Sequence, residues 1–369
     1  MPGSTTSSSA APPLAQIYFY LTEGCNCACR HCWLAPKFDP DATRYPTLPV
    51  AQFEQVVAEA KPLGLQSVKL TGGEPLMHPG IDELLAIVER EELGLVIETN
   101  GLLLDRELAA RITRCGRPTV SVSIDGAAAP VHDAVRGVPG AFDRAIAGIR
   151  VLVEAGLAPH LVLSVMRDNV SQVEPVVRLA EQLGARLLKF NLIQPTERGV
   201  DLHDSGDALS VTELLALGRW VEGDLAASTS VKLYFDWPWA FRALPRIAQP
   251  EGQGGCSILS ILGVLASGHY ALCGIGESVP ELLFGRVAEV PLADVWQTNE
   301  VLLSIREGLP NRLSGVCGEC LHKGVCLGAC VAQNYYRSHD LFAPFWFCHG
   351  ADEQGLFPPS RRIPATQQG

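Results

Sequence analysis

The chain has 369 residues, of which 47% are hydrophobic and 19% charged, so it can bury a large core and is neither disordered nor fibrous. Its 29 basic and 40 acidic residues give a formal net charge of -11, which argues against undirected binding to nucleic acid or to an anionic membrane. No apolar run approaches the roughly 18 residues of a membrane span, and the N-terminus lacks the basic and apolar regions of a signal peptide. We therefore expect a cytoplasmic protein, whose 12 cysteines serve metal or redox chemistry rather than disulfides.

Residues 1–15 are rich in Ser, Thr, Ala and Pro, which predicts a flexible tail. From residue 16 to about 195, short apolar runs alternate with amphipathic stretches. The first of these stretches has four apolar residues on one helix face, at Phe53, Val56, Val57 and Ala60. The apolar runs are near-continuous, as in parallel strands buried on both faces, and lie at 17–22, 67–72, 95–99, 119–124, 160–165 and 187–193. Six such units predict an α/β fold, either an open sheet or a partial (β/α)6 barrel, with ligands at the carboxyl ends of the strands.

The pattern changes after about residue 240. Strand signals become shorter, Gly is frequent, and seven of the 12 cysteines lie between positions 256 and 348. The apolar periodicity is too weak for an ordinary core, so bound groups are expected to hold this segment together. We therefore divide the chain into a tail (1–15), a core domain (16–240) and a C-terminal domain (241–369).

Four cysteines lie within eight residues directly after the first predicted strand, at Cys25, Cys27, Cys29 and Cys32. A zinc loop or a group of buried thiols is one interpretation. The other is that Cys25, Cys29 and Cys32 give three thiolates to a [4Fe-4S] cluster and leave one iron open to a further ligand. The position of Cys27 favours a small buried thiol outside this trio.

Gly72-Gly73-Glu74-Pro75 follows the second predicted strand. The two glycines would let the backbone approach a small ligand, and the Glu74 carboxylate can accept hydrogen bonds from a protonated amine. Gly-Gly and Glu-Pro are also ordinary turn sequences, so this motif alone leaves both interpretations open.

The C-x3-C-x2-C spacing followed by GGEP resembles the radical S-adenosylmethionine (SAM) superfamily, and the resemblance covers residues 17 to about 195. It implies that the open iron binds the amino and carboxylate groups of SAM and that the reduced cluster cleaves SAM to a 5'-deoxyadenosyl radical. One departure is His31, where the family often has an aromatic residue. The resemblance assigns to SAM the residues Gly72, Gly73, Glu74, Thr99, Asn100, Ser123, Asp125 and Arg136.

The roles that the resemblance implies differ between Ser123, Arg136 and Asp125. Ser123 and Arg136 would hold the SAM carboxylate, an anion that suits a guanidinium group. Asp125 either binds SAM or caps the helix that follows it.

The second cysteine group consists of Cys256, Cys273, Cys317, Cys320, Cys326, Cys330 and Cys348. A zinc ribbon needs four thiolates. Seven exceed one set of four and fall one short of two, which fits two iron-sulfur clusters, one of them incompletely ligated by cysteine.

This pattern resembles the SPASM domain, the C-terminal extension of radical SAM enzymes that carries two auxiliary clusters. The resemblance implies three [4Fe-4S] clusters in all. The auxiliary cluster near the active site would be held by Cys256, Cys273 and Cys330, and the outer one by Cys317, Cys320, Cys326 and Cys348. Residues 257–262, where some relatives provide an eighth cysteine, contain none. We interpret Cys115 as a core thiol and Trp296 as a packing residue.

The resemblance implies an enzyme that modifies a ribosomally made peptide or protein through a crosslink, a thioether or a related C–H reaction. Gly274 stands where sulfatase-maturing relatives have an acidic residue, which disfavours that reaction. The expected partners are the substrate and a reductant such as flavodoxin or ferredoxin. Because the residues before the first strand are too few for a recognition module, a leader peptide would be bound by a separate protein or recognised directly through a short motif. Asp236 is a candidate acid or base, or else a turn residue.

Two alternatives remain. One is a radical SAM/SPASM enzyme that acts on a small molecule or a tetrapyrrole. The other is a non-catalytic iron-sulfur electron carrier or zinc-binding protein, against which the SAM motifs argue.

Overall fold

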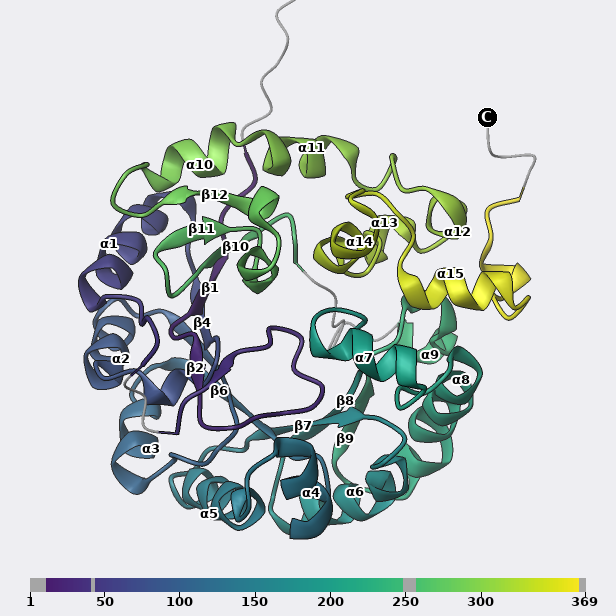
Figure 1. Cartoon of the computed structure of the whole chain (residues 1–369), viewed down its shortest axis with the longest axis horizontal. Helices are drawn as coiled ribbons and strands as arrows, with labels where there is room; N and C mark the ends of the chain where they lie inside the picture. Colours follow the sequence, from purple (N-terminus) through teal and green to yellow (C-terminus); the bar gives the residue numbers. More distant parts are fainter. Residues whose placement is uncertain (1–10, 41–43, 248–256, 365–369) are drawn as a thin grey trace, which may run out of the picture.

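The computed structural model describes residues 11–40, 44–247 and 257–364. At its centre is a sheet in the order β12-β11-β10-β1-β4-β5-β6-β7-β8-β9, which curves so that the helices lie around its outside (Figure 1). Its strands are β1 (Gln16–Tyr20), β4 (Ser67–Thr71), β5 (Gly94–Thr99), β6 (Gly116–Ser123), β7 (His160–Val165), β8 (Leu187–Leu192), β9 (Lys232–Phe235), β10 (Ile261–Val264), β11 (His269–Ala271) and β12 (Leu283–Arg286). The short strands β2 (Gly24–Cys25) and β3 (Lys37–Phe38) pair separately and close the first cysteine loop.

The first helix, α1, buries the face that the sequence predicted, which consists of Phe53, Val56, Val57 and Ala60. The helices around the core are α1 (Val50–Ala60), α2 (Ile81–Arg90), α3 (Arg106–Ile112), α4 (Ala129–Arg136), α5 (Ala141–Glu154), α6 (Val173–Gln182), α7 (Arg198–Ser205), α8 (Val211–Trp220) and α9 (Leu244–Ile247). Those that follow are α10 (Leu292–Thr298), α11 (Glu300–Gly308), α12 (Gly315–Gly318), α13 (Lys323–Cys326), α14 (Val331–Ser338) and α15 (Trp346–Glu353). The α/β prediction is confirmed, and the six expected strands are β1, β4, β5, β6, β7 and β8.

The strands are not buried on both faces, as the sequence suggested. In β4, Val68 and Leu70 are fully buried, whereas Lys69 between them lines a pocket. In β8, Lys189 and Asn191 face the same pocket. Because side chains alternate along a strand, one face packs under the helices and the other forms the wall of the pocket.

The C-terminal region shares its core with the rest of the chain. β10 lies parallel to β1, so the sheet continues across residue 240, and α10 packs against α1. Leu262, Tyr270 and Phe347 belong to the same apolar cluster as Ile17. The expectation that this region lacks an apolar core is therefore wrong, because short strands and helices bury their apolar residues against the first half of the chain. The domain boundary near residue 240 stays a prediction.

The segment just before β1 is packed rather than free. Leu14 is fully buried and donates its backbone N–H to the Leu63 carbonyl. Trp296 packs in the core, as predicted, and its indole N–H donates to the Pro12 carbonyl. The tail prediction is thus wrong for residues 11–15, while residues 1–10 lie outside the described part. Within the described ranges, no helix is long and apolar enough to cross a membrane.

Candidate functional site

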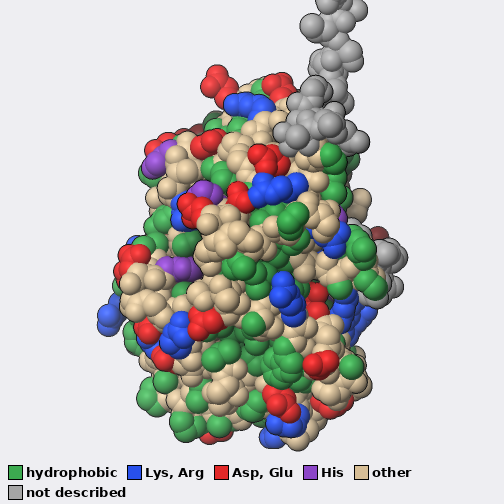
Figure 2. All heavy atoms as spheres, turned by 90° about the vertical axis from the view of Figure 1, so that its right-hand side faces the viewer, with side chains coloured by type: hydrophobic (Ala, Val, Ile, Leu, Met, Phe, Trp, Pro, Cys, Tyr) green, Lys and Arg blue, Asp and Glu red, His purple; other side chains and the backbone are tan. Residues whose placement is uncertain are grey.

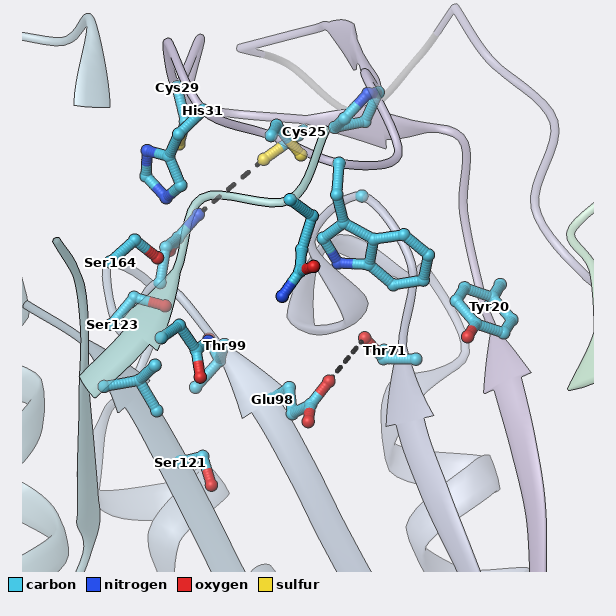
Figure 3. A pocket seen from close by; sticks show the side chains of 18 of the residues that line it. Tyr20, Cys25, Cys29, His31, Thr71, Glu98, Thr99, Ser121, Ser123 and Ser164 are labelled. Carbon is cyan, nitrogen blue, oxygen red and sulfur yellow. Dashed lines mark hydrogen bonds between the residues drawn. The ribbon is translucent and has the colours of Figure 1, made fainter. Parts of the chain in front are cut away.

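A pocket of about 400 Å³ opens at the carboxyl ends of the parallel strands. Side chains from the ends of β4, β5, β6 and β7 point into it, beneath the loop that carries the first cysteines (Figure 3). Its polar lining includes Thr71, Glu98, Thr99, Ser121, Ser123 and Ser164. This is the edge of the sheet at which the sequence predicted a ligand site.

The first cysteine loop forms one wall of this pocket. Cys25, Cys29 and Cys32 all line it, and so does Cys27, whose side chain is buried as expected. The Cys27 thiol lies within hydrogen-bonding distance of Cys29 and, together with the Arg136 guanidinium, lowers the pKa of Cys29 despite its burial. Cys29 is therefore suited to act as a thiolate ligand.

The two glycines of the GGEP motif bring the strand end against the cysteine loop. A Cβ on Gly73 would lie 1.9 Å from the Gly24 carbonyl oxygen, and Gly72 has φ of +121° beside the backbone of Leu21 and Thr22. Backbone hydrogen bonds from Gly73 to Thr22 and from Glu74 to Gly24 fix the contact. Glycine is therefore required at these two positions because the backbone packs closely against the first cysteine loop. Gly73 also lines the pocket, where a ligand would be bound.

Glu74 is buried between the cysteine loop and the end of β5. Its carboxylate accepts hydrogen bonds from the Thr99 hydroxyl at 2.7 Å and from the backbone N–H groups of Leu76 and Asn100. Burial outweighs these bonds and raises the pKa of Glu74 to about 7. Asn100 in turn donates to Asn26 in the cysteine loop, at 2.6 Å. Hydrogen bonds through Glu74, Thr99 and Asn100 thus connect the predicted amine site to the first cysteine loop.

Asp125 and Arg136 form a buried ion pair, with 2.7 Å between Oδ2 and Nη2. The other Asp125 oxygen accepts the backbone N–H of Ser164. Asp125 is fully buried and caps no helix, because α4 begins after Ala128. It holds the guanidinium that lines the pocket beside Cys29. A contact between Asp125 and SAM stays a prediction.

Two buried polar atoms in this wall have no hydrogen-bond partner, namely Nδ1 of His31 and Nε of Arg136. Both residues line the pocket. Unpartnered buried polar groups are costly in a folded protein, so these two atoms favour a polar ligand here.

Two ion pairs that were not predicted from the sequence also line this pocket. Lys69 of β4 contacts Glu98 of β5 at 2.7 Å, and Lys189 of β8 contacts Asp236 at 2.9 Å. Burial disfavours charge on Lys189, but Asp236 outweighs it and raises the pKa of Lys189. Asp236, the candidate acid or base, therefore lies in the pocket as an ion-pair partner. Lys189 could have been found from the sequence, because it is a lone charge between apolar residues of a predicted strand.

Cys273 and Cys330 approach the pocket from the C-terminal region and line the same space as the first cysteine loop. Cys256, the third residue expected to share their cluster, lies outside the described residues. Cys115 is buried with its thiol against the Leu85 carbonyl, as expected of a core thiol.

The remaining four cysteines, Cys317, Cys320, Cys326 and Cys348, line a second, smaller cavity, which we call the outer site. Between Cys326 and Cys330 the chain turns through three successive residues with positive φ, Leu327 (53°), Gly328 (77°) and Ala329 (59°). This tight turn takes the chain from the outer site to the main pocket within four residues. The expected ligand sets are thus grouped in space as far as they are described.

No three His, Cys, Asp or Glu side chains in the described ranges are arranged around a point that could hold a single metal ion. All the described cysteines are free thiols.

Comparison with known proteins agrees with this geometry. Residues 19–180 match the model of the radical SAM superfamily. The AdoMet-dependent heme synthase of Methanosarcina barkeri is 30% identical over 344 residues, covering 90% of this chain and 95% of that protein. The mycofactocin maturase MftC of Mycobacterium tuberculosis is 27% identical over 364 residues, covering 93% and 85%.

Solved structures show the same fold at lower identity. SuiB of Streptococcus suis, bound to S-adenosylmethionine, has a TM-score of 0.71 at 19% identity, covering 92% of this chain and 77% of SuiB. AnSMEcpe with bound AdoMet has a TM-score of 0.70 at 16% identity, covering 92% and 96%. The chain is therefore a radical SAM superfamily enzyme with a C-terminal SPASM-type extension.

Proposed function

We propose that this enzyme uses SAM to oxidise or crosslink a ribosomally made peptide. One observation carries the proposal: a single pocket has the SAM-type cysteine loop on one wall, Cys273 and Cys330 on another, and a charged strand wall between them. A substrate bound there would lie within reach of both cysteine groups. Such a site can generate a substrate radical and then remove an electron from it.

The donor sets fit the groups that the family implies. Cys25, Cys29 and Cys32 would hold the SAM-binding [4Fe-4S] cluster, for which free thiols and a Cys29 poised as thiolate are suitable. The two auxiliary clusters would be held as the cysteine spacing predicts, giving about 12 iron atoms per chain. When bound, cluster and SAM supply a 5'-deoxyadenosyl radical that can abstract hydrogen from an unactivated C–H bond.

The residues of the chain orient SAM in this proposal. Arg136, held by Asp125, offers its guanidinium to the SAM carboxylate beside Ser123. Glu74 presents its carboxylate to the SAM amino group, through the lone pairs that Thr99 and the backbone leave free. His31 Nδ1 is a further free group on this wall.

The strand wall supports a peptide substrate. The pairs Lys69–Glu98 and Lys189–Asp236 present both positive and negative charge, together with serine hydroxyl groups. Such a mixed surface complements a peptide, whose backbone offers donors and acceptors at short intervals. Asp236, held by Lys189, is placed to accept a proton from the substrate. MftC is named a maturase, and SuiB is solved with its precursor peptide SuiA.

The second candidate substrate is a tetrapyrrole. The observation that favours it is the match to AdoMet-dependent heme synthases, which covers nearly the full length of the M. barkeri protein at 30% identity. Lys69 and Lys189 could then bind carboxylate side chains of the macrocycle.

The test supplies reduced, reconstituted enzyme and SAM with each substrate class in parallel. One arm uses the product of a small peptide gene beside this one, with and without its leader sequence; the other uses a porphyrin with propionate side chains. Mass spectrometry that finds loss of hydrogen from the peptide, dependent on SAM, supports the first candidate. Change in the porphyrin alone supports the second, and 5'-deoxyadenosine formation without change in either substrate contradicts both.

A further inference from the structure

Two large apolar side chains are exposed directly beside the outer site. Leu321 follows Cys320 and is 53% exposed, and Val325 precedes Cys326 and is 57% exposed. We call this pair the Leu321–Val325 patch. The side of the molecule on which α12 and α15 lie faces the viewer in Figure 2, where hydrophobic side chains reach the surface among basic and acidic ones.

Such exposure is unusual in this chain. Across the described residues, the other exposed large apolar side chains are Phe38, Val153, Leu244 and Leu356, which are scattered in sequence, and only Leu244 is as exposed as Leu321 and Val325, which lie within five residues of each other. The loop that carries them is fixed, because the Leu321 N–H donates to the Arg361 carbonyl and Cys320 pairs with Arg362. The apolar side chains are therefore displayed by an ordered backbone, as in surfaces that bind partners.

The charges around the patch are mainly positive. Lys323 lies between the two apolar residues, and Arg361 and Arg362 lie on the segment that pairs with the loop. Arg362 is itself paired with two carboxylates, those of Glu319 and Asp352. Lys323 and Arg361, which form no ion pair among the described residues, therefore supply the positive charge of the patch. In a chain with net charge -11, this surface would attract an acidic protein, while most of the remaining surface would repel it.

The Leu321–Val325 patch is also close along the chain to the cysteines of both the outer site and the main pocket. Cys320 and Cys326 line the outer site, and the turn from Leu327 to Ala329 leads directly to Cys330 in the main pocket. A partner seated on Leu321 and Val325 would be separated from the outer cysteines by the thickness of one loop.

We propose that the Leu321–Val325 patch is the docking surface for an acidic electron-carrier protein, an inference that rests on the proposed function. In the docked pair, a reduced carrier would pass one electron to the iron-sulfur group that Cys317, Cys320, Cys326 and Cys348 would hold. The carrier is oxidised by one electron, the protein is reduced by one electron, and no bond forms or breaks.

The test uses the holoenzyme and a flavodoxin as the acidic carrier, under anaerobic conditions. Binding is measured by titration, and electron transfer by the stopped-flow rate of oxidation of the reduced flavodoxin. The double variant Leu321→Asp/Val325→Asp is expected to raise Kd at least about tenfold and to slow electron transfer, because it puts charge of the partner's own sign into the contact. Val153→Asp, at an exposed apolar position on α5, is the matched control and should bind like the parent.

Two further measurements protect the test against a misfolded loop. Iron content shows whether the double variant keeps its clusters. If the double variant has lost iron, the docking site is tested instead with Lys323→Glu and with the salt dependence of flavodoxin binding to the parent. Both added salt and Lys323→Glu should weaken binding. Binding by these variants equal to that of the parent, or binding insensitive to salt, overturns the docking site.

SAM cleavage driven by dithionite separates this inference from the proposed function. The docking variants should cleave SAM at the parent rate with this chemical reductant. A parent enzyme that cannot cleave SAM contradicts the proposed function, whereas normal cleavage together with unchanged flavodoxin binding in the variants contradicts only the docking site.

Discussion

The main pocket and the outer site both gather cysteines, but different side chains surround the sulfur atoms. In the main pocket, carboxylates, hydroxyl groups and a guanidinium from several strands face the same space as Cys25, Cys29 and Cys32. The outer site is lined mostly by apolar residues such as Leu313, Val316 and Phe357. The difference indicates that the first site is built to bind a polar ligand, and the second only to enclose the group that its cysteines hold.

The largest effect is expected in the main pocket. Replacing Cys25, Cys29 and Cys32 together by Ala should abolish formation of 5'-deoxyadenosine, because SAM cleavage requires the cluster that these thiolates would hold. Liquid chromatography of reaction mixtures with reduced protein measures the product. Formation at the parent rate would show that the trio does not hold the SAM cluster.

The outer site should respond differently to the same kind of change. Cys317→Ala/Cys320→Ala should remove about four of about 12 iron atoms per chain but leave SAM cleavage by dithionite-reduced protein largely intact. Iron analysis and product formation, measured on one preparation, check both parts. Complete loss of SAM cleavage in a variant that has lost no more than these four iron atoms would show that the outer site is also needed for SAM cleavage.

Arg136→Ala tests the polar wall of the main pocket. The loss of a charge-assisted hydrogen bond, roughly 1.5 to 3 kcal/mol, should weaken SAM binding about tenfold or more. It also leaves the Asp125 carboxylate buried without its partner, which destabilises the fold by about 3–5 kcal/mol.

Adding Asp125→Asn should therefore restore part of the melting temperature but not the SAM affinity. Calorimetric titration and thermal unfolding of both variants separate the two effects. If the double variant binds SAM as the parent does, Arg136 has only a structural role.

The raised pKa of Glu74, about 7, predicts pH-dependent SAM binding. Between pH 8 and pH 6 the ionised fraction of such a group falls about tenfold, and with it the attraction for the SAM ammonium group. The Kd for SAM should rise about tenfold over this range, and Glu74→Gln should show weak binding without this pH dependence. A parent profile that is flat from pH 8 to pH 6 would exclude Glu74 as the amine ligand.

Cys27→Ala should have the smallest effect. Its thiol is buried beside Cys29 and lowers the pKa of Cys29, but Arg136 lowers that pKa as well, and Cys27 falls outside the spacing of the trio. SAM cleavage and iron content should therefore remain close to those of the parent. Loss of iron comparable to that of Cys29→Ala would make Cys27 a ligand.

The sequence predicted the parallel strands and the cysteine groups because both depend on local pattern. Apolar runs of strand length identify β1 and β4 to β8, and cysteine spacing groups the ligands. The pocket wall was harder to predict, because Lys69–Glu98 and Lys189–Asp236 join different elements, and only the order and register of the strands bring them together. The role of Asp125 depends in the same way on Ser164, 39 residues away in sequence.

The packing of the C-terminal region was missed for a related reason. Short strands such as β11 and β12 give little periodicity, and their apolar residues find partners on elements formed much earlier in the chain. Residues 11–15 likewise look like a tail by composition, yet Leu14 meets the Leu63 backbone only in the folded state.

The pairing of β10 with β1 has a consequence for synthesis of the chain. β1 receives its second neighbour only when residues 261–264 are available, although its first neighbour, β4, is complete at residue 71. At about 5–20 residues per second, a ribosome needs roughly 10–40 s to make the intervening 189 residues, 72–260. During that time one edge of β1 offers unpaired backbone groups to other strands. The nascent protein is therefore most exposed to aggregation before the C-terminal region emerges, and a chain that ends before β10 would keep this open edge permanently.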